Sequence, residues 1–210
     1  MNFLGHTHAA LASDDDPAFL VGAVLPDLAP MARVRVDRSR LTGLLARGVR
    51  AHLQTDAAFH AHPEFRRGVT AIRDDLVDHQ VRRGPARAVA HAGWELLLDG
   101  TLIGSATEAA FHGALDHAGD DAAVALASAD QAQWHAFLAR WRELPSPRLR
   151  YDDPAWVADR LHDMLATRPR LSFPRSQVPV VRQVLATHAP AVVASASTIF
   201  ASVRDATTPV

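Results

Sequence analysis

The chain has 210 residues, of which 48% are hydrophobic and 21% charged, and its formal net charge is -1. A chain of this length and hydrophobicity can bury a substantial core, which excludes extensive disorder. The balanced charge gives no global attraction to nucleic acid, so we expect no nucleic-acid partner. Because the chain contains no cysteine, it cannot form a disulfide or a thiolate metal site, and any metal ligands must be His, Asp or Glu.

The first residues lack the features of an export signal. A signal peptide needs a basic segment followed by an apolar run, whereas this chain places His6 and His8 within its first ten residues. No stretch reaches the roughly 18 consecutive apolar residues of a membrane span. The sequence therefore predicts a cytoplasmic protein with no membrane association.

Apolar residues recur at helical spacing with Ala, Leu and Arg between them, which predicts an all-α protein. We expect one compact multi-helix bundle over residues 1–205, with residues 206–210 frayed. The expected helices are Asn2–Ala12, Pro17–Leu25, Leu41–His60, Phe65–Val81, Pro85–Gly104, Thr107–His117, Ala122–Leu144, Pro154–Ala166 and Pro179–Val203. Pro26 is expected to end the second helix, which puts Asp27 in a loop. Prolines also predict loops at residues 145–147 and 168–170.

Candidate metal ligands recur every four residues in two of these helices. His52, Asp56 and His60 lie in the third expected helix. Four helical residues advance about 400°, so their side chains share one stripe. The fifth expected helix repeats the pattern with His91, Glu95 and Asp99. Facing helices with such stripes build metal cages in bundles, so we expect the two stripes to share one divalent metal centre. The alternative is two solvated polar faces with ordinary ion pairs.

Further candidate ligands lie near the start of the chain. His6 and His8 form an H-x-H pair. Because residues i and i+2 of a helix point about 200° apart, we expect one of the two imidazoles, and not both, to enter the site. Asp27 is either a third ligand or an Asx-turn residue. Nitrogen and oxygen ligands of these types suit manganese, iron, zinc or magnesium.

Six segments of the chain carry a family resemblance. They are Met1–Ala10, Gly22–Leu28, Gly48–Asp56, Pro63–Glu64, Trp94–Leu98 and Ala166–Leu171. In this order and at similar spacing they resemble the acyl-carrier-protein phosphodiesterase family, which is itself similar to the HD-type metal-dependent phosphohydrolases. The resemblance implies a helical fold, a divalent cation such as manganese, and hydrolysis of the phosphodiester that joins 4'-phosphopantetheine to a carrier-protein serine.

The resemblance also implies which residues surround the metal. The positions that match those of the family are His6, His8, Asp27, His52 and Asp56. The chain departs from the family pattern after Trp94, where it has Glu95 and Leu96 in place of an Asp–His pair. His91 stands one turn earlier, where the family often has Asp. We expect metal binding to survive this exchange and the substrate to change.

Together these features predict a metal-dependent phosphoric-diester hydrolase. Its expected ligands are His6, His8, Asp27, His52, Asp56, His91 and Glu95. Asp27 or His60 is expected to act as general base or to orient a water molecule, and Arg168 and Arg170 to bind substrate. The expected partner is an acyl carrier protein or a small phosphoester. The alternative is a non-catalytic helical protein that binds a carrier protein or a metabolite in a His-rich pocket.

Overall fold

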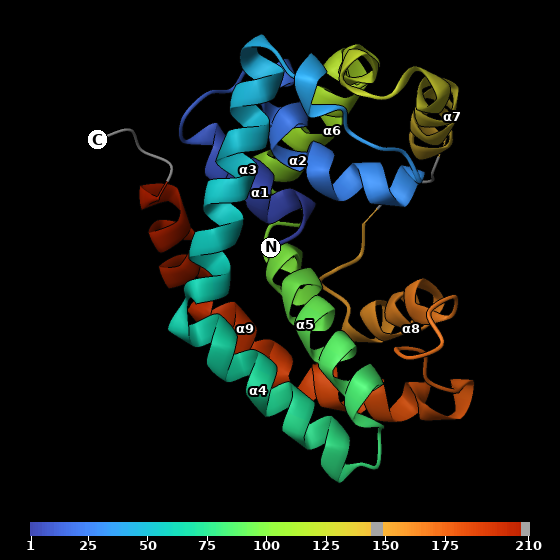
Figure 1. The fold of residues 1–210 in the computed structure, drawn as a ribbon. Helices are drawn as coiled ribbons and strands as arrows, with labels where there is room; N and C mark the ends of the chain where they lie inside the picture. Colours follow the sequence, from blue (N-terminus) through green and yellow to red (C-terminus); the bar gives the residue numbers. More distant parts are fainter. Residues whose placement is uncertain (144–148, 207–210) are drawn as a thin grey trace. The chain divides into compact units, whose positions relative to one another are not determined.

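The structure, a computed structural model, describes residues 1–143 and 149–206. Over these ranges the chain forms helices and no strand, which confirms the all-α prediction (Figure 1). The α-helices are α1 (Phe3–Leu11), α2 (Pro17–Ala32), α3 (Gly43–Ala61), α4 (Pro63–Asp78), α5 (Arg83–Gly100), α6 (Ala106–Ala118), α7 (Gln131–Arg142), α8 (Pro154–Leu165) and α9 (Val178–Asp205). Short 3-10 helices cover Arg38–Arg40, Asp121–Ala125, Ser128–Asp130 and Arg175–Gln177.

The described residues form two compact units, each assembled from segments that are distant in sequence. Unit 1 contains Met1, Phe59–Ile103 and Leu149–Ile199. Unit 2 contains the described part of Asn2–Ala58, Gly104–Arg148 and Phe200–Val210. The sequence predicts one domain over residues 1–205, whereas the contacts group the chain into these two units. Residues 145–147 of one expected loop, and all but the first residue of the expected frayed end, lie outside the described residues.

Several helices begin where the sequence predicts, because a side chain caps the first turn. Asp16 accepts the N–H of Ala18 at the start of α2, and Asp153 accepts the N–H of Ala155 at the start of α8. A proline follows each of these caps and supplies a first helical residue that needs no hydrogen-bond partner. In α4 the cap is the imidazole of His62, again followed by proline.

The predicted end of α2 is wrong. The helix continues through Pro26 and Pro30 to Ala32, so Asp27 lies within a helix and not in a loop. A proline removes one intrahelical hydrogen bond and normally kinks or ends a helix. Here the residues beyond Pro26 include Leu28 and Ala29, which are buried, and their burial favours the continued helix over the local preference.

The start of the expected helix at 122–144 is also wrong. Residues 121–130 form two 3-10 turns around an extended Leu126, and α7 begins only at Gln131. The extended segment pairs with residues 35–37, since Asp37 donates its N–H to the Ala125 carbonyl at 2.7 Å and Val36 forms an isolated β-bridge with Leu126. This tertiary pairing overrides the helical propensity of the alanines. The other expected helices agree with the structure within a few residues.

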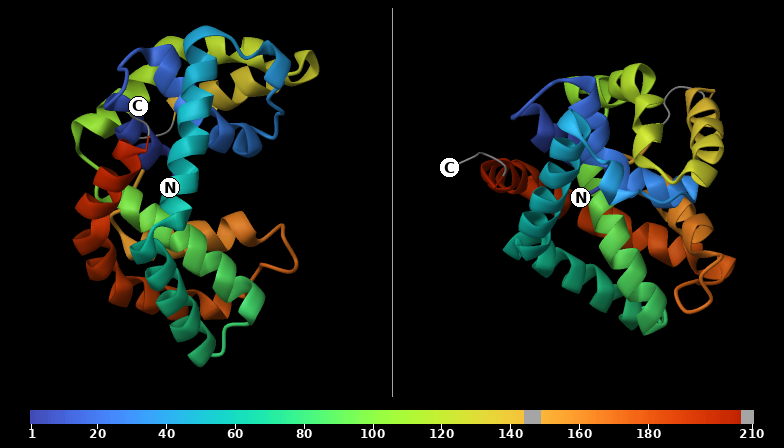
Figure 2. Two further views of the ribbon diagram at one scale, coloured as in Figure 1. Left: turned by 60° about the vertical axis from the view of Figure 1, so that its left-hand side comes forward. Right: turned by 45° about the horizontal axis from the view of Figure 1, so that its top comes forward.

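Each unit has its own aromatic core. In unit 1, α4 and α5 lie side by side in every view (Figure 2), and the Phe65 ring meets the Trp94 ring edge-on at 5.4 Å. In unit 2, α1 packs against α2 and α6, where the Phe3 ring stacks on Phe111 at 5.7 Å and meets Trp141 edge-on. These cores hold the helices that carry the predicted ligands.

One helical stretch, Arg175–Asp205, is long and apolar enough to cross a membrane. Its most apolar window has a mean hydropathy of 1.5, and 33% of that window is buried in the structure. The stretch contains Arg182 and His188, so its apolar residues do not form the unbroken run of roughly 18 that is typical of a membrane span. Core helices pass the same test, and the cytoplasmic location stays a prediction.

Helices α2 and α3 touch through two glycines. A Cβ atom on Gly48 would lie 2.1 Å from the Phe19 carbonyl oxygen, and one on Gly22 would lie 2.4 Å from the Leu45 carbonyl oxygen. Both distances are far below van der Waals contact, so only glycine permits this backbone approach. The contact lies about one turn before Asp27 on α2 and before His52 on α3.

We expect Gly48→Ala to lower the free energy of unfolding by roughly 1–3 kcal/mol, the usual cost of overpacking a core, although alanine is the better helix former. Gly113→Ala is the matched control, because Gly113 lies within α6 and a Cβ there would meet nothing within 4 Å. That variant should gain up to about 1 kcal/mol. Urea unfolding of both variants measures the difference, and equal gains would contradict the close α2–α3 contact.

Candidate metal centre

The predicted ligands gather in two clusters. The first, which we call the His6 cluster, consists of His6, Asp27, His52 and Asp56 in unit 2. The second, which we call the His91 cluster, consists of His60, His91 and Glu95 in unit 1.

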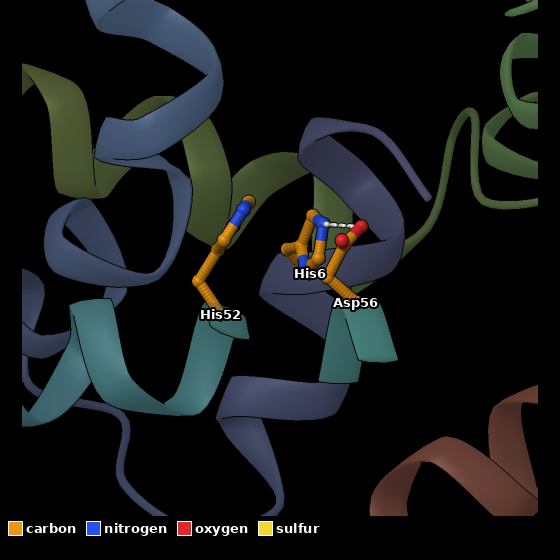
Figure 3. Close-up of side chains that lie close together, drawn as sticks. All are labelled: His6, His52 and Asp56. Atoms are coloured by element: carbon orange, nitrogen blue, oxygen red, sulfur yellow. Dashed lines mark ion pairs between the residues drawn. The ribbon is translucent and has the colours of Figure 1, made fainter. Parts of the chain in front are cut away.

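Side chains from three helices form the His6 cluster. Figure 3 shows the His6 ring between His52 and Asp56. His6 Nε2 lies 3.7 Å from Asp27 Oδ2 and 4.0 Å from Asp56 Oδ1. His52 Nε2 lies 3.9 Å from Asp27 Oδ1, and the two imidazole rings stack with centroids 3.9 Å apart. His6 Nε2 therefore lies near both carboxylates, and His52 Nε2 lies near that of Asp27.

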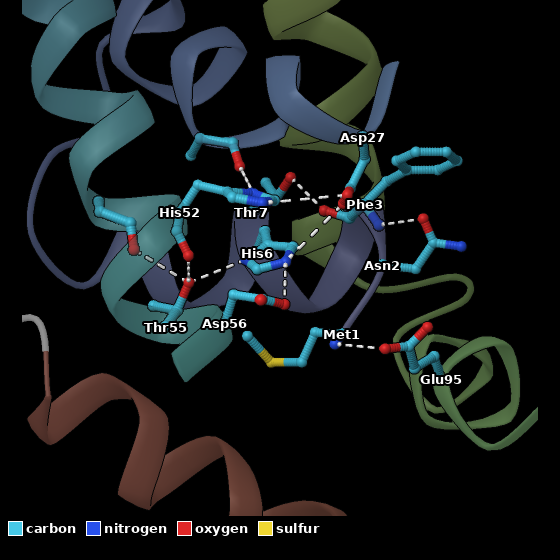
Figure 4. A network of polar contacts seen from close by, with 12 residues as sticks. Met1, Asn2, Phe3, His6, Thr7, Asp27, His52, Thr55, Asp56 and Glu95 are labelled. Atoms are coloured by element: carbon cyan, nitrogen blue, oxygen red, sulfur yellow. Dashed lines mark hydrogen bonds and ion pairs between the residues drawn. The ribbon is translucent and has the colours of Figure 1, made fainter. Parts of the chain in front are cut away.

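Hydrogen bonds on the far side of each ring set this orientation (Figure 4). His52 Nδ1 lies 2.9 Å from the Ala23 carbonyl oxygen, which can only accept a hydrogen bond. His6 Nδ1 lies 2.8 Å from Thr55 Oγ1. The Thr55 hydroxyl donates its own hydrogen to backbone carbonyls at 2.9–3.0 Å, so it accepts from His6. Both rings thus carry their hydrogen on Nδ1 and present the Nε2 lone pair to the carboxylates, as metal-ligating histidines do.

Burial favours the neutral form of an imidazole, whereas contact with solvent favours the charged form of a carboxylate. The His6 side chain is fully buried, whereas those of Asp27 and Asp56 are 29% and 39% exposed. Desolvation lowers the pKa of His52, against the opposing effects of the Ala23 carbonyl and Asp56. Two uncharged nitrogen donors next to two anionic oxygen donors suit a divalent cation.

His8 does not join the His6 cluster, which corrects its assignment as a ligand. Its Nδ1 lies 3.2 Å from Thr107 Oγ1 and its ring packs on Phe200 with centroids 4.9 Å apart. The reason is the one expected from helix geometry, since residues two apart on α1 point to different sides. Of the two imidazoles of the H-x-H pair, that of His6 lies with His52 and Asp56.

The four residues predicted to share one centre are divided between the two clusters. His52 and Asp56 lie with His6, whereas His91 and Glu95 lie with His60. His60, which the sequence offers as the alternative to Asp27 for the general base or for orienting a water molecule, lies with Glu95, at 3.2 Å. Helical spacing identifies which residues share a stripe, but it carries no information on which helix that stripe faces.

Glu95 is the negative centre of the His91 cluster. Its Oε1 lies 3.2 Å from both His60 Nε2 and His91 Nε2 and 3.3 Å from the Met1 ammonium nitrogen. Desolvation by burial raises the pKa of the Glu95 carboxyl, but the ammonium charge and the hydrogen bonds from the two histidines outweigh it and hold the pKa well below its usual range. The next residue, Leu96, is only 2% exposed, so a histidine in its place would be buried in the unit 1 core.

The two arginines expected to bind substrate lie in unit 1. Both line an open pocket of about 530 Å³ at the loop over residues 168–170. Arg168 also lines a second pocket, of about 460 Å³, which includes Arg87 and His91. The predicted loop is confirmed, and its role in substrate binding stays a prediction.

Sequence reasoning missed the groups that orient the imidazoles. Thr55 is 1% exposed and lies between the two ligand positions of α3. A threonine in the middle of a helix, three residues after a histidine, was the available signal, because its hydroxyl can bond within the helix and still accept from a neighbour. The Ala23 carbonyl left no signal in the sequence, since every residue has one.

Comparisons with known proteins find no matching family model, no matching curated protein and no matching solved structure. The similarity to HD-type phosphohydrolases therefore stays a prediction.

We expect Thr55→Val to weaken Mn²⁺ binding by about 10–100-fold, the usual effect of removing the outer partner of a ligand histidine. The change keeps the size of the side chain but removes the acceptor that holds His6 Nδ1–H. Thr55→Ser is the matched control, because it retains the hydroxyl and should bind Mn²⁺ nearly as the unmodified chain does. Calorimetric titration of metal-free protein measures both affinities. Equal affinities of the two variants would contradict the role of Thr55.

We also expect the metal-free protein to lose stability as the pH falls below about 6.5. Burial lowers the pKa of both His8 and His52 from the ordinary value of 6.5, and Arg204 adds to the effect at His8. Above that value both residues are neutral in the folded and the unfolded chain. As the pH drops below 6.5, the histidines are protonated in the unfolded chain but stay neutral in the folded chain. The free energy of unfolding therefore decreases until the pH reaches the lower pKa of the folded state.

The His8→Gln variant isolates one of these contributions, because glutamine does not titrate. Its melting temperature should fall less between pH 7.5 and pH 5.5 than that of the unmodified chain. The corresponding difference in the free energy of unfolding between the two proteins is at most about 1.4 kcal/mol for each pH unit. Parallel pH profiles of the two proteins would show that His8 titrates normally in the folded chain.

Proposed function

We propose that this protein is a metal-dependent phosphoric-diester hydrolase whose divalent cation binds at the His6 cluster. The observation that carries the proposal is the fixed orientation of His6 and His52, whose Nδ1 atoms are held at 2.8 and 2.9 Å by oxygen acceptors. Buried ring N–H groups are ordinarily hydrogen-bonded, and here both acceptors lie at Nδ1. This leaves both Nε2 atoms for one cation, as in metal-ligating histidines.

The donor separations in the cluster are wider than those of a tetrahedral zinc site. Donors about 2.0–2.2 Å from a six-coordinate ion are separated by about 2.8–3.1 Å when adjacent and about 4.0–4.4 Å when opposite. The measured separations between imidazole nitrogen and carboxylate oxygen, 3.7–4.0 Å, lie between these two values. Two imidazoles with two carboxylates suit manganese, with iron, zinc or magnesium as alternatives.

The residues of the His6 cluster have different proposed roles. His6 and His52 supply neutral donors, and Asp27 places one oxygen near each of them. Asp56 is the most exposed member of the cluster at 39%, and a phosphate group can approach from its side. A divalent cation bound here would supply Lewis acidity for a phosphoryl oxygen and lower the pKa of a water molecule. No cysteine is present to offer a thiol nucleophile, which favours water as the attacking group.

The substrate class follows from the resemblance to the acyl-carrier-protein phosphodiesterases. The residues of the His6 cluster all belong to the segments that carry this resemblance. We therefore propose a phosphodiester substrate, with the phosphopantetheine arm of a carrier protein as the first candidate. The exchange at Glu95 and Leu96 lies in the other unit, so it leaves the ligands of the His6 cluster unchanged.

We expect Asp56→Ala to reduce the hydrolysis of an aryl phosphodiester and of a holo-carrier protein by roughly 100-fold or more, since loss of a direct ligand should cost at least as much as loss of an outer partner. The assay compares the purified protein with added Mn²⁺, Mg²⁺, Fe²⁺ and Zn²⁺ and with a chelator. Mass spectrometry of the carrier protein identifies the bond that is cleaved.

Asp116→Ala is the matched control. Asp116 lies in α6 of the same unit, its side chain is 46% exposed, and it forms an ion pair with Arg142. Full activity of the Asp116 variant with loss in the Asp56 variant supports the proposal. Metal binding at Asp56 without hydrolysis of either substrate would favour a non-catalytic binding protein instead.

A further inference from the structure

We propose that His60, His91 and Glu95 form a second metal site, separate in its ligands from the His6 cluster and suited to a four-coordinate Zn²⁺ ion. All three residues belong to unit 1. His60 lies in the last turn of α3, and His91 and Glu95 lie one turn apart on α5.

The three donor atoms form a nearly equilateral triangle. His60 Nε2 lies 3.3 Å from His91 Nε2, and each nitrogen lies 3.2 Å from Glu95 Oε1. Two donors placed about 2.0–2.1 Å from a tetrahedral zinc ion are separated by about 3.3–3.4 Å. The triangle therefore matches one face of a zinc tetrahedron, whereas the wider separations of the His6 cluster do not.

Aromatic contacts hold the two imidazoles in this arrangement. The His60 and His91 rings are nearly parallel, with an angle of 15° between their planes. Both meet the buried Phe65 ring edge-on, at 5.2 and 5.3 Å. A site whose ligands are already oriented requires little rearrangement when the ion binds, which favours affinity.

The charges around Glu95 also point to a cation. Its side chain is only 16% exposed, and a single oxygen, Oε1, receives both imidazoles and the Met1 ammonium group. Two imidazole nitrogens at 3.3 Å from each other cannot both be protonated without repulsion. An ion above the face of this triangle would replace the hydrogens that the two imidazoles donate to Oε1, and both nitrogens and the carboxylate would hold it.

The ligand set differs in chemistry from that of the His6 cluster. Two imidazoles with one carboxylate and an open fourth position are typical of zinc sites that take a water or a substrate group. His91 is 45% exposed and lines the pocket of about 460 Å³. The same pocket is lined by Arg87 and Arg168 and by apolar side chains such as Leu161 and Leu165. The open position would therefore be reached by a small anion with an apolar body.

Metal content after dialysis against Zn²⁺ tests this proposal on the full chain. We expect two zinc ions per unmodified chain, a count that rests on the proposed function, in which the His6 cluster also takes a divalent ion. His91→Ala should retain one ion, and so should His60→Gln, which removes a different ligand. Both side chains are partly exposed, at 45% and 33%, so neither variant is expected to unfold. Asp56→Ala should also retain one ion, the one held by the His91 cluster.

The matched control is His79→Ala. His79 is 43% exposed and pairs with Asp75 four residues earlier on α4, but it belongs to neither cluster among the described residues. This variant should keep both ions. Substitution of Co²⁺ for Zn²⁺ gives a second readout, since four-coordinate cobalt absorbs visible light far more strongly than six-coordinate cobalt. The strong absorption should disappear in His91→Ala and persist in Asp56→Ala.

The outcomes separate the two proposals. Zinc content and cobalt absorption that are unchanged in both His91→Ala and His60→Gln would overturn the second site, whatever the His6 cluster binds. A single ion that is lost in Asp56→Ala and kept in His91→Ala would likewise overturn it and leave the proposed hydrolase intact. A single ion that is lost in His91→Ala and kept in Asp56→Ala would support the second site and count against the His6 cluster as a metal centre.

Discussion

The close contact between α2 and α3 is the constraint on which the His6 cluster depends. Gly22 and Gly48 let the two backbones meet at distances that no side chain would allow. At this separation the His52 ring, one turn beyond Gly48, reaches the Ala23 carbonyl and faces Asp27 on the same partner helix. A wider spacing would break the hydrogen bond that sets the tautomer of His52. Two residues without side chains thus control the direction of a ligand several ångströms away.

Burial also affects the charge of His52. Desolvation lowers the pKa of this imidazole and so favours its neutral form. Neutral imidazole is also the form that binds metals. The hydrogen bonds to Thr55 and Ala23 then decide which nitrogen carries the lone pair. Packing, protonation and ligand direction are in this way set by the same few contacts.

The sequence predicts the local structure of this protein better than its tertiary contacts. Helical periodicity and capping residues identify most helices, and they place His52 and Asp56 on one stripe of α3. The continuation of α2 past Pro26 depends on the burial of Leu28 and Ala29, and the extended Leu126 depends on pairing with Val36. Neither partner is close in sequence. For the same reason the four-residue spacing could not show that His60 and His91 belong together while His52 belongs with His6.

Under the two proposals, the donor separations of the two clusters would give them different selectivity. The affinities of divalent ions follow a common order at nitrogen and oxygen sites, so geometry and ligand type decide which ion is held. The His6 cluster has two carboxylates and separations of 3.7–4.0 Å, which are wider than a tetrahedral zinc ion needs. The His91 cluster has one carboxylate and separations of 3.2–3.3 Å, which suit four ligands. Helix α3 contributes to both clusters, and His60 follows Asp56 by four residues. If both proposals hold, a single amphipathic helix supplies ligands to two metal sites because its neighbours set different donor distances along its length.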